Sequence, residues 1–159
     1  MKTQSYRVII TFIFLGLFWF SCNEAKPPYD FKDQPLQGKI NNIEWEYLSG
    51  VARPSFTSED TLIVGLYNME FDNPCTYAVS EEGLRFSIPK EIGVHLLGGS
   101  VELSEAVIFY QSTIKEYGFG GAIEILNINY NEMVIEGRAD VRVDNESFVN
   151  GNFLIKFCD

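Results

Sequence analysis

The sequence has few of the residues that bind nucleic acid or zinc. Its 159 residues include 12 lysines and arginines against 22 aspartates and glutamates, for a formal net charge of −10. Phosphate recognition depends on clustered basic side chains, so this balance argues against a nucleic-acid partner. One histidine and three cysteines leave little material for a zinc site. We therefore expect no metal and no cofactor.

The sequence also lacks a hydrophobic run of the length that spans a bilayer. Residues 8–20 form a run of 13 residues that is interrupted only by Thr11 and Gly16, whereas a spanning helix needs about 20. Hydrophobic residues nevertheless make up 46% of the sequence, which argues against disorder. A chain of this size can bury one core and is too short for two ordinary domains.

Residues 1–21 have the pattern of an export signal. Lys2 and Arg7 give a positive start, the apolar run follows, and Ser21-Cys22 leads into polar sequence. A short apolar run with these flanks is typical of a secretory signal peptide. Removal of residues 1–21 would leave a chain that begins at Cys22.

A small residue directly before a cysteine, at the end of such a run, resembles the signal of bacterial lipoproteins. In this sequence Trp19 stands where that family usually has an aliphatic residue. The resemblance implies lipid on the Cys22 thiol, a membrane as partner, and localisation in the cell envelope, at the outer membrane. Two or more acyl chains give stable anchoring. Ordinary cleavage elsewhere, an uncleaved short anchor and chance placement of Cys22 are the alternatives.

Residues 22–35 are predicted to be the lipidated cysteine and a flexible tether. Pro27, Pro28 and Pro35 fall in this segment together with charges of both signs. Prolines at this density disfavour a helix and a packed core. The alternative is an edge strand that docks on the domain through Tyr29 and Phe31.

Residues 36–159 are predicted to form a single all-β domain. Apolar and polar residues alternate with a period of two, most clearly over 133–143, which is typical of strands with one buried face. About nine short strands favour an antiparallel β-sandwich or a calycin-like barrel, with the last three strands in a meander. The predicted strands are 37–41, 43–51, 61–71, 84–88, 94–97, 106–112, 121–130, 133–143 and 149–158.

Several short motifs resemble a family of small secreted lipoproteins from the Bacteroidota whose role is unknown. The matching pieces are 38–41 leading to Trp45, then 92–96, 121–125, 135–137 and 150–153. The resemblance implies a compact β domain and an envelope location, and it brings no catalytic residues. The triplet Asp60-Thr61-Leu62 also resembles the acceptor motif of Bacteroidota protein O-glycosylation, with an ordinary strand start as the alternative.

Cys75 and Cys158 remain once Cys22 is set aside. Outside the cytoplasm such a pair usually oxidises, so we predict a disulfide between them. The two residues lie 83 positions apart, and closing such a loop stabilises a fold by roughly 4–4.5 kcal/mol in the chain-entropy estimate. Two separate thiols are the alternative.

Few residues suggest chemistry. Glu44 and Glu46 lie two apart on a predicted strand, at about the spacing of the paired carboxylates of glycosidases. The pair faces away from Trp45 and Tyr47, so the pattern favours a solvated face. Neighbouring residues on a strand point to opposite faces, so an aromatic in Phe109-Tyr110 or in 117–119 is expected to be exposed. The possible ligand contacts are Tyr110, Tyr117 and Phe119.

These observations predict a function of a general kind. The expected protein is a membrane-anchored envelope lipoprotein, not an enzyme, whose β domain binds a partner protein, a glycan or a small ligand. One alternative is a carrier of small apolar ligands, with room inside a barrel at Gly137 and Ala139. A more remote alternative is a glycan hydrolase that uses Glu44 and Glu46.

Overall fold

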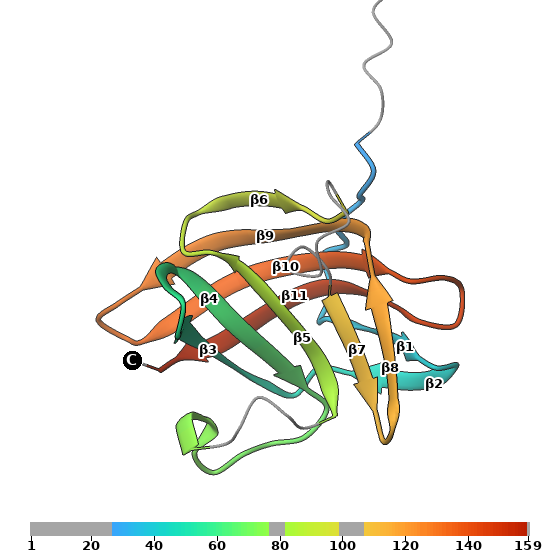
Figure 1. Ribbon diagram of the computed structural model, residues 1–159, viewed down its shortest axis with the longest axis horizontal. Coiled ribbons are helices and arrows are strands. Elements are labelled where there is room, and N and C mark those ends of the chain that lie inside the picture. Colours follow the sequence, from blue (N-terminus) through green and yellow to red (C-terminus); the bar gives the residue numbers. More distant parts are fainter. Residues whose placement is uncertain (1–26, 77–81, 99–106, 159) are drawn as a thin grey trace, which may run out of the picture.

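A computed structural model of the chain describes residues 27–76, 82–98 and 107–158. The predicted signal peptide, residues 1–21, and Cys22 lie outside the described residues. Eleven strands and one short 3-10 helix are described (Figure 1). They are β1 (Gln37–Ile40), β2 (Ile43–Glu46), β3 (Ser49–Ser55), β4 (Ser58–Tyr67), η2 (Pro74–Thr76), β5 (Gly83–Pro89), β6 (Gly93–Leu96), β7 (Val107–Gln111), β8 (Ile114–Gly118), β9 (Gly120–Asn129), β10 (Val134–Arg142) and β11 (Phe148–Phe157).

The strands belong to one sheet, which curls into a half-barrel (Figure 1). Its order is β6-β9-β10-β11-β3-β4-β5-β7-β8, and the β1–β2 hairpin pairs with the start of β11. The prediction of an all-β domain is confirmed. The expected sheet was antiparallel, but β11 and β3 pair in parallel, with Lys156 opposite Val51. The sheet is therefore mixed. Its parallel pair brings together two strands that are far apart in the sequence.

The predicted meander at the end of the chain is confirmed. β10 pairs antiparallel with β9 on one side and with β11 on the other. Alternation in β10 has the predicted direction, since Ile135 and Val141 are buried whereas Glu136 and Arg142 are exposed. One outward residue departs from the expectation, because Asp140 is only 8% exposed.

A single large core lies inside the curl. Phe86 on β5 and Phe153 on β11 face each other across it, with their ring centroids 6.5 Å apart. Trp45 on β2 closes the core from the hairpin side and is 6% exposed. Fully burying one such apolar side chain contributes about 1.5–3 kcal/mol, so these contacts between distant strands hold the curl closed.

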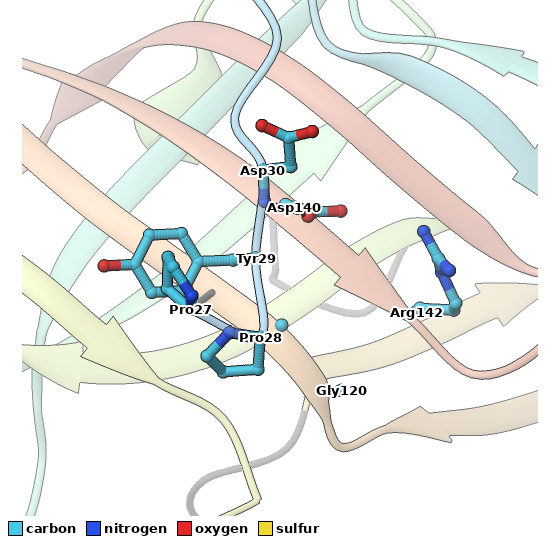
Figure 2. A pocket seen from close by; sticks show the side chains of 8 residues that line it. Pro27, Pro28, Tyr29, Asp30, Gly120, Asp140 and Arg142 are labelled. Atoms are coloured by element: carbon cyan, nitrogen blue, oxygen red, sulfur yellow. Dashed lines mark hydrogen bonds between the residues drawn. The ribbon is translucent and has the colours of Figure 1, made fainter. Parts of the chain in front are cut away.

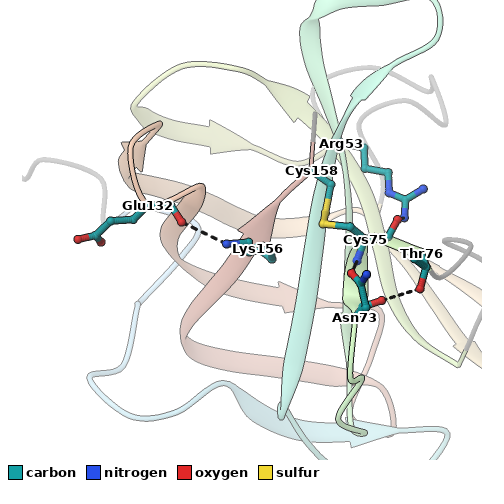
Figure 3. Close-up of a disulfide and its surroundings, with 7 residues drawn as sticks. All are labelled: Arg53, Asn73, Cys75, Thr76, Glu132, Lys156 and Cys158. Carbon is teal, nitrogen blue, oxygen red and sulfur yellow. Dashed lines mark hydrogen bonds between the residues drawn. A yellow bond between two sulfur atoms is a disulfide. The ribbon is translucent and has the colours of Figure 1, made fainter.

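Cys75 and Cys158 form the predicted disulfide (Figure 3). Their Cα atoms are 5.6 Å apart, a distance that is typical of a bridge. The bond joins η2 to the end of β11. Val51, Tyr67 and Phe71 pack around it in a second apolar cluster, separate from the core. The disulfide thus attaches the segment after β4 to the C-terminal strand.

Candidate functional site

Residues 27–35, called the strap from here on, are bonded to the sheet. The backbone N–H of Asp30 donates to Asp140 Oδ2 (2.7 Å). The Asn150 amide bonds the strap twice, since its Oδ1 accepts from the Lys32 N–H (2.8 Å) and its Nδ2 donates to the Asp30 carbonyl (3.0 Å). Over residues 27–35 these bonds favour the docking alternative over the flexible tether. The rest of the predicted tether, from Cys22 to residue 26, lies outside the described residues.

The sheet presents two buried polar side chains, Asp140 and Asn150, to this strap. Asp140 on β10 and Asn150 on β11 lie directly opposite each other in the register, and each is only 8% exposed. Buried polar groups need hydrogen-bond partners. The strap backbone supplies them, because its prolines leave it extended and free of a helix's internal bonds.

Aromatic side chains add a second set of contacts. The rings of Tyr29 and Phe31 lie 4.9 Å apart on the strap. The Arg138 guanidinium lies 4.6 Å from the centre of the Phe31 ring, at a distance typical of a cation–π contact. Arg138 also bonds the Glu124 carboxylate on β9. Tyr29 and Phe31 are the two residues through which the docking alternative places this segment on the domain. The strap, however, forms one bridge, Pro35 to Asn152, rather than a strand.

The strap borders a groove on the outer face of the sheet, with a volume of about 870 Å³. Tyr47, Leu126 and Leu154 give it apolar surface, and Leu126 and Leu154 are 40% and 60% exposed. Its polar lining residues come from the strap and from β10 and β11: Asp33, Gln34, Glu136, Arg138 and Asn152. The groove therefore presents hydrogen-bond donors and acceptors beside an apolar surface.

Tyr47 is held firmly at the wall of this groove. Its hydroxyl donates to the Leu154 carbonyl. Burial raises the pKa of Tyr47 from 10.0 to about 12, and the bond to Leu154 offsets part of that rise. The phenol is therefore neutral at every physiological pH, and it can act in the groove as an apolar ring rather than as a base.

A second, smaller hollow lies at the other end of the strap (Figure 2). It has a volume of about 300 Å³. Pro27, Pro28 and Tyr29 line it on the strap side. On the sheet side Gly120 and Arg142 lie at its edge, where they are partners in the β9–β10 register.

The candidate ligand contacts predicted from the sequence lie elsewhere. Tyr110 and Tyr117 share the outer face of the β7–β8 hairpin, where Lys115 Nζ lies 5.3 Å from the centre of the Tyr110 ring. Phe119 is the single residue between β8 and β9. Tyr117 and Phe119 are 38% and 40% exposed. None of these three residues lines the groove or the hollow.

Glu44 and Glu46 are exposed on β2, which is the outer strand of its hairpin. Glu44 pairs with Lys39 at 3.2 Å, and 82% of its side chain is exposed. Neither carboxylate lines the groove or the hollow. Across the described ranges, no three His, Cys, Asp or Glu side chains converge in a way that could hold a metal ion.

The room expected at Gly137 is occupied by an aromatic ring. A Cβ atom on Gly137 would lie 2.5 Å from Phe153 Cζ, so the ring lies directly against the glycine. Ala139 is likewise in the filled core. At these two positions, the space that suggested an apolar cavity belongs to the packing. Thr61 of the possible glycosylation triplet is half-buried in β4, opposite Pro89.

Sequence reasoning did not find the pair of Asp140 and Asn150 that binds the strap, nor the groove. A signal was available, because Asp and Asn are depleted in strands, yet Asp140, Asn150 and Asn152 all fall within predicted strands. Their clustering on one outward face becomes visible only when the register of β10 and β11 is known.

None of the three comparisons, with protein-family models, with curated proteins and with solved structures, found a match to this chain. Among the residues that the structure describes, no helix has the length and apolar character to cross a membrane.

Proposed function

We propose that this protein is a lipid-anchored protein of the bacterial cell envelope that binds a glycan, without catalysis, in the groove beside the strap. The observation that carries the proposal is the lining of that groove. It combines charged and amide side chains from three segments with the fixed ring of Tyr47 and the exposed side chain of Leu154.

The mixture of groups suits a sugar better than an apolar molecule. Carboxylates such as Glu136 accept hydrogen bonds, Arg138 donates them, and Asn152 does both. Sugars offer many hydroxyl groups that need both kinds of partner, together with C–H faces that pack on apolar surface. Ligand sites generally combine apolar surface with a few polar groups that fix orientation. A partner protein remains the competing class of ligand.

Calorimetric titration with envelope polysaccharides and their oligosaccharides tests the glycan. Glu136→Gln removes a charged acceptor, and losing such a bond costs about 1.5–3 kcal/mol, so affinity should fall about ten-fold or more. Glu132→Gln is the matched control, because Glu132 is exposed on the same hairpin and does not line the groove. Equal affinity for both variants, or no glycan binding, would contradict the proposal.

The absence of catalysis has its own test. The bound glycan is incubated with the protein, and its chain length and reducing ends are followed. We expect no change. Cleavage that stops in Glu44→Gln would instead establish the hydrolase alternative.

The anchor is tested on the mature form from envelope membranes. We expect mass spectrometry to find Cys22 at the new N-terminus with added diacylglycerol. Cys22→Ser should leave the protein soluble in the periplasmic fraction or uncleaved. An intact Met1, or an unmodified thiol at Cys22, would contradict this part of the proposal.

A further inference from the structure

The first residue of the strap, Pro27, lies five positions after Cys22. It is close to a patch of exposed apolar side chains. The patch consists of Leu96, Val94 and Phe119, which are 57%, 41% and 40% exposed. Leu96 is the register partner of Ala122 on β9, and Gly98 lies against Phe119. The patch therefore lies along the first half of β9, where Gly120 and Gly121 line the hollow together with the first residues of the strap.

The strap also limits how the domain can turn. The strap is fixed to Asp140 from Asp30 onward, and the eight residues from Cys22 to Asp30 reach at most about 29 Å when fully extended. A lipid at Cys22 therefore cannot lie far from this end of the domain. In Figure 1 the N-terminal end of the strap, in blue, leaves beside the end of β6 and the start of β9.

We propose that the patch of Val94, Leu96 and Phe119 rests on the bilayer, so that this end of the domain faces the membrane. The inference rests on the proposed anchoring through Cys22. An apolar surface beside the anchor can enter the interface to a depth of about 5–10 Å. Exposed Arg142, the register partner of Gly120, is placed to meet lipid phosphates.

Charge shows why the contact is local. Loss of residues 1–21 removes Lys2 and Arg7 and no acid, so the remaining chain has a formal charge of −12. Anionic lipid repels such a body. Contact through three apolar side chains and one arginine needs no attraction between the whole domain and the bilayer. The anchor at Cys22 would hold the patch at high effective concentration near the bilayer. Even a small patch can then stay in contact with the lipid.

The test anchors the chain chemically. The chain from residue 22 to 159 is coupled through the Cys22 thiol to maleimide lipid in zwitterionic vesicles that contain brominated lipid. Cys75 and Cys158 are bridged, which leaves Cys22 to react. Tryptophan is placed by Phe119→Trp or Leu96→Trp. Ile114→Trp, at the far end of β8, is the matched control, because Ile114 is 44% exposed.

Bromine quenches on contact, so interfacial insertion should lower the emission of the Phe119→Trp and Leu96→Trp proteins about two-fold. The quenching of the Ile114→Trp protein should equal that of the unsubstituted protein, in which buried Trp45 gives the background emission. Moving the anchor with Cys22→Ser and Thr113→Cys should abolish the quenching at position 119. Equal quenching at all sites, or none, would overturn the proposal.

The same vesicles separate the orientation from the anchor. Because coupling is chemical, quenching at positions 96 and 119 supports the orientation even if the native form carries no lipid. A native lipid without this quenching would uphold the anchor and overturn the orientation. A dimer of the uncoupled protein that dissociates on Leu96→Ser would assign the patch to a second copy and would also overturn it.

Discussion

The backbone N–H of Asp30 donates a hydrogen bond to the carboxylate of Asp140, 110 residues further along the chain. Neighbouring Asn150 bonds the same strap from the next strand. From Asp30 to Lys32 the strap backbone thus bonds to side chains of the sheet, whereas at Gln34 it bonds to the Asn152 backbone. Bonds of this kind contribute about 0.5–1.5 kcal/mol each, so together they hold the strap without making it part of the core.

Replacing Asn150 by alanine should release the strap. The change removes the acceptor for the Lys32 N–H and the donor to the Asp30 carbonyl. We expect a loss of about 1–3 kcal/mol in the free energy of unfolding. The Lys32 amide should exchange its hydrogen much faster, while amides of β10 keep their protection. Asn127→Ala, at an exposed asparagine on β9, should leave the Lys32 amide unchanged. Continued protection in Asn150→Ala would show that other contacts hold the strap.

Opening the disulfide should cost more than any single hydrogen bond. The bridge closes a loop of 83 residues, for which the chain-entropy estimate is about 4 kcal/mol. Cys75→Ser with Cys158→Ser should therefore lower the midpoint of thermal unfolding by roughly 10 °C or more. Reductant should lower the midpoint of the parent protein and leave that of the double variant unchanged. A parent midpoint that does not respond to full reduction would contradict this prediction.

The local parts of the fold could be predicted from the sequence. Alternation over 133–143 predicted which residues of β10 face the core, because side chains in a strand change face at every step. The cysteine pairing followed from the compartment that the signal pattern predicts and from the small number of cysteines. In both cases the deciding information lies within a short stretch or in a simple count.

The parts that were missed depend on contacts between distant residues. No pattern near Val51 reveals that it lies opposite Lys156 in a parallel pair. Likewise, Asp140 has the sequence context of a solvated position and becomes buried only when the strap crosses it. The groove was missed for the same reason, because its lining residues come from the strap and from β10 and β11, which lie far from the strap in the sequence.

Gly137→Ala should be destabilising although alanine is the smallest change available. The new Cβ would lie 2.5 Å from Phe153 Cζ and 2.7 Å from the Glu124 carbonyl oxygen. Overpacking of this kind typically costs about 1–3 kcal/mol. Phe153→Leu alone should also destabilise, because it removes buried surface. In the double variant the ring clash is gone, so the combined loss should be smaller than the sum of the two. Strict additivity in denaturant unfolding would show that the backbone contact alone decides the cost.

Alkaline pH should weaken the fold through Tyr47. Its pKa is about 12 in the folded protein against 10.0 for the ordinary phenol. The folded state therefore keeps the Tyr47 proton over a pH range in which the unfolded state loses it. By linkage, this contribution to stability is complete below pH 10 and is lost as the pH rises toward 12. Denaturant unfolding at a series of pH values measures the loss, and absorbance at alkaline pH should show one tyrosine that ionises late. Tyr47→Phe has no phenol to ionise, so it should lose less stability over this range than the parent. If both proteins weaken equally with pH, the buried phenol is not the cause.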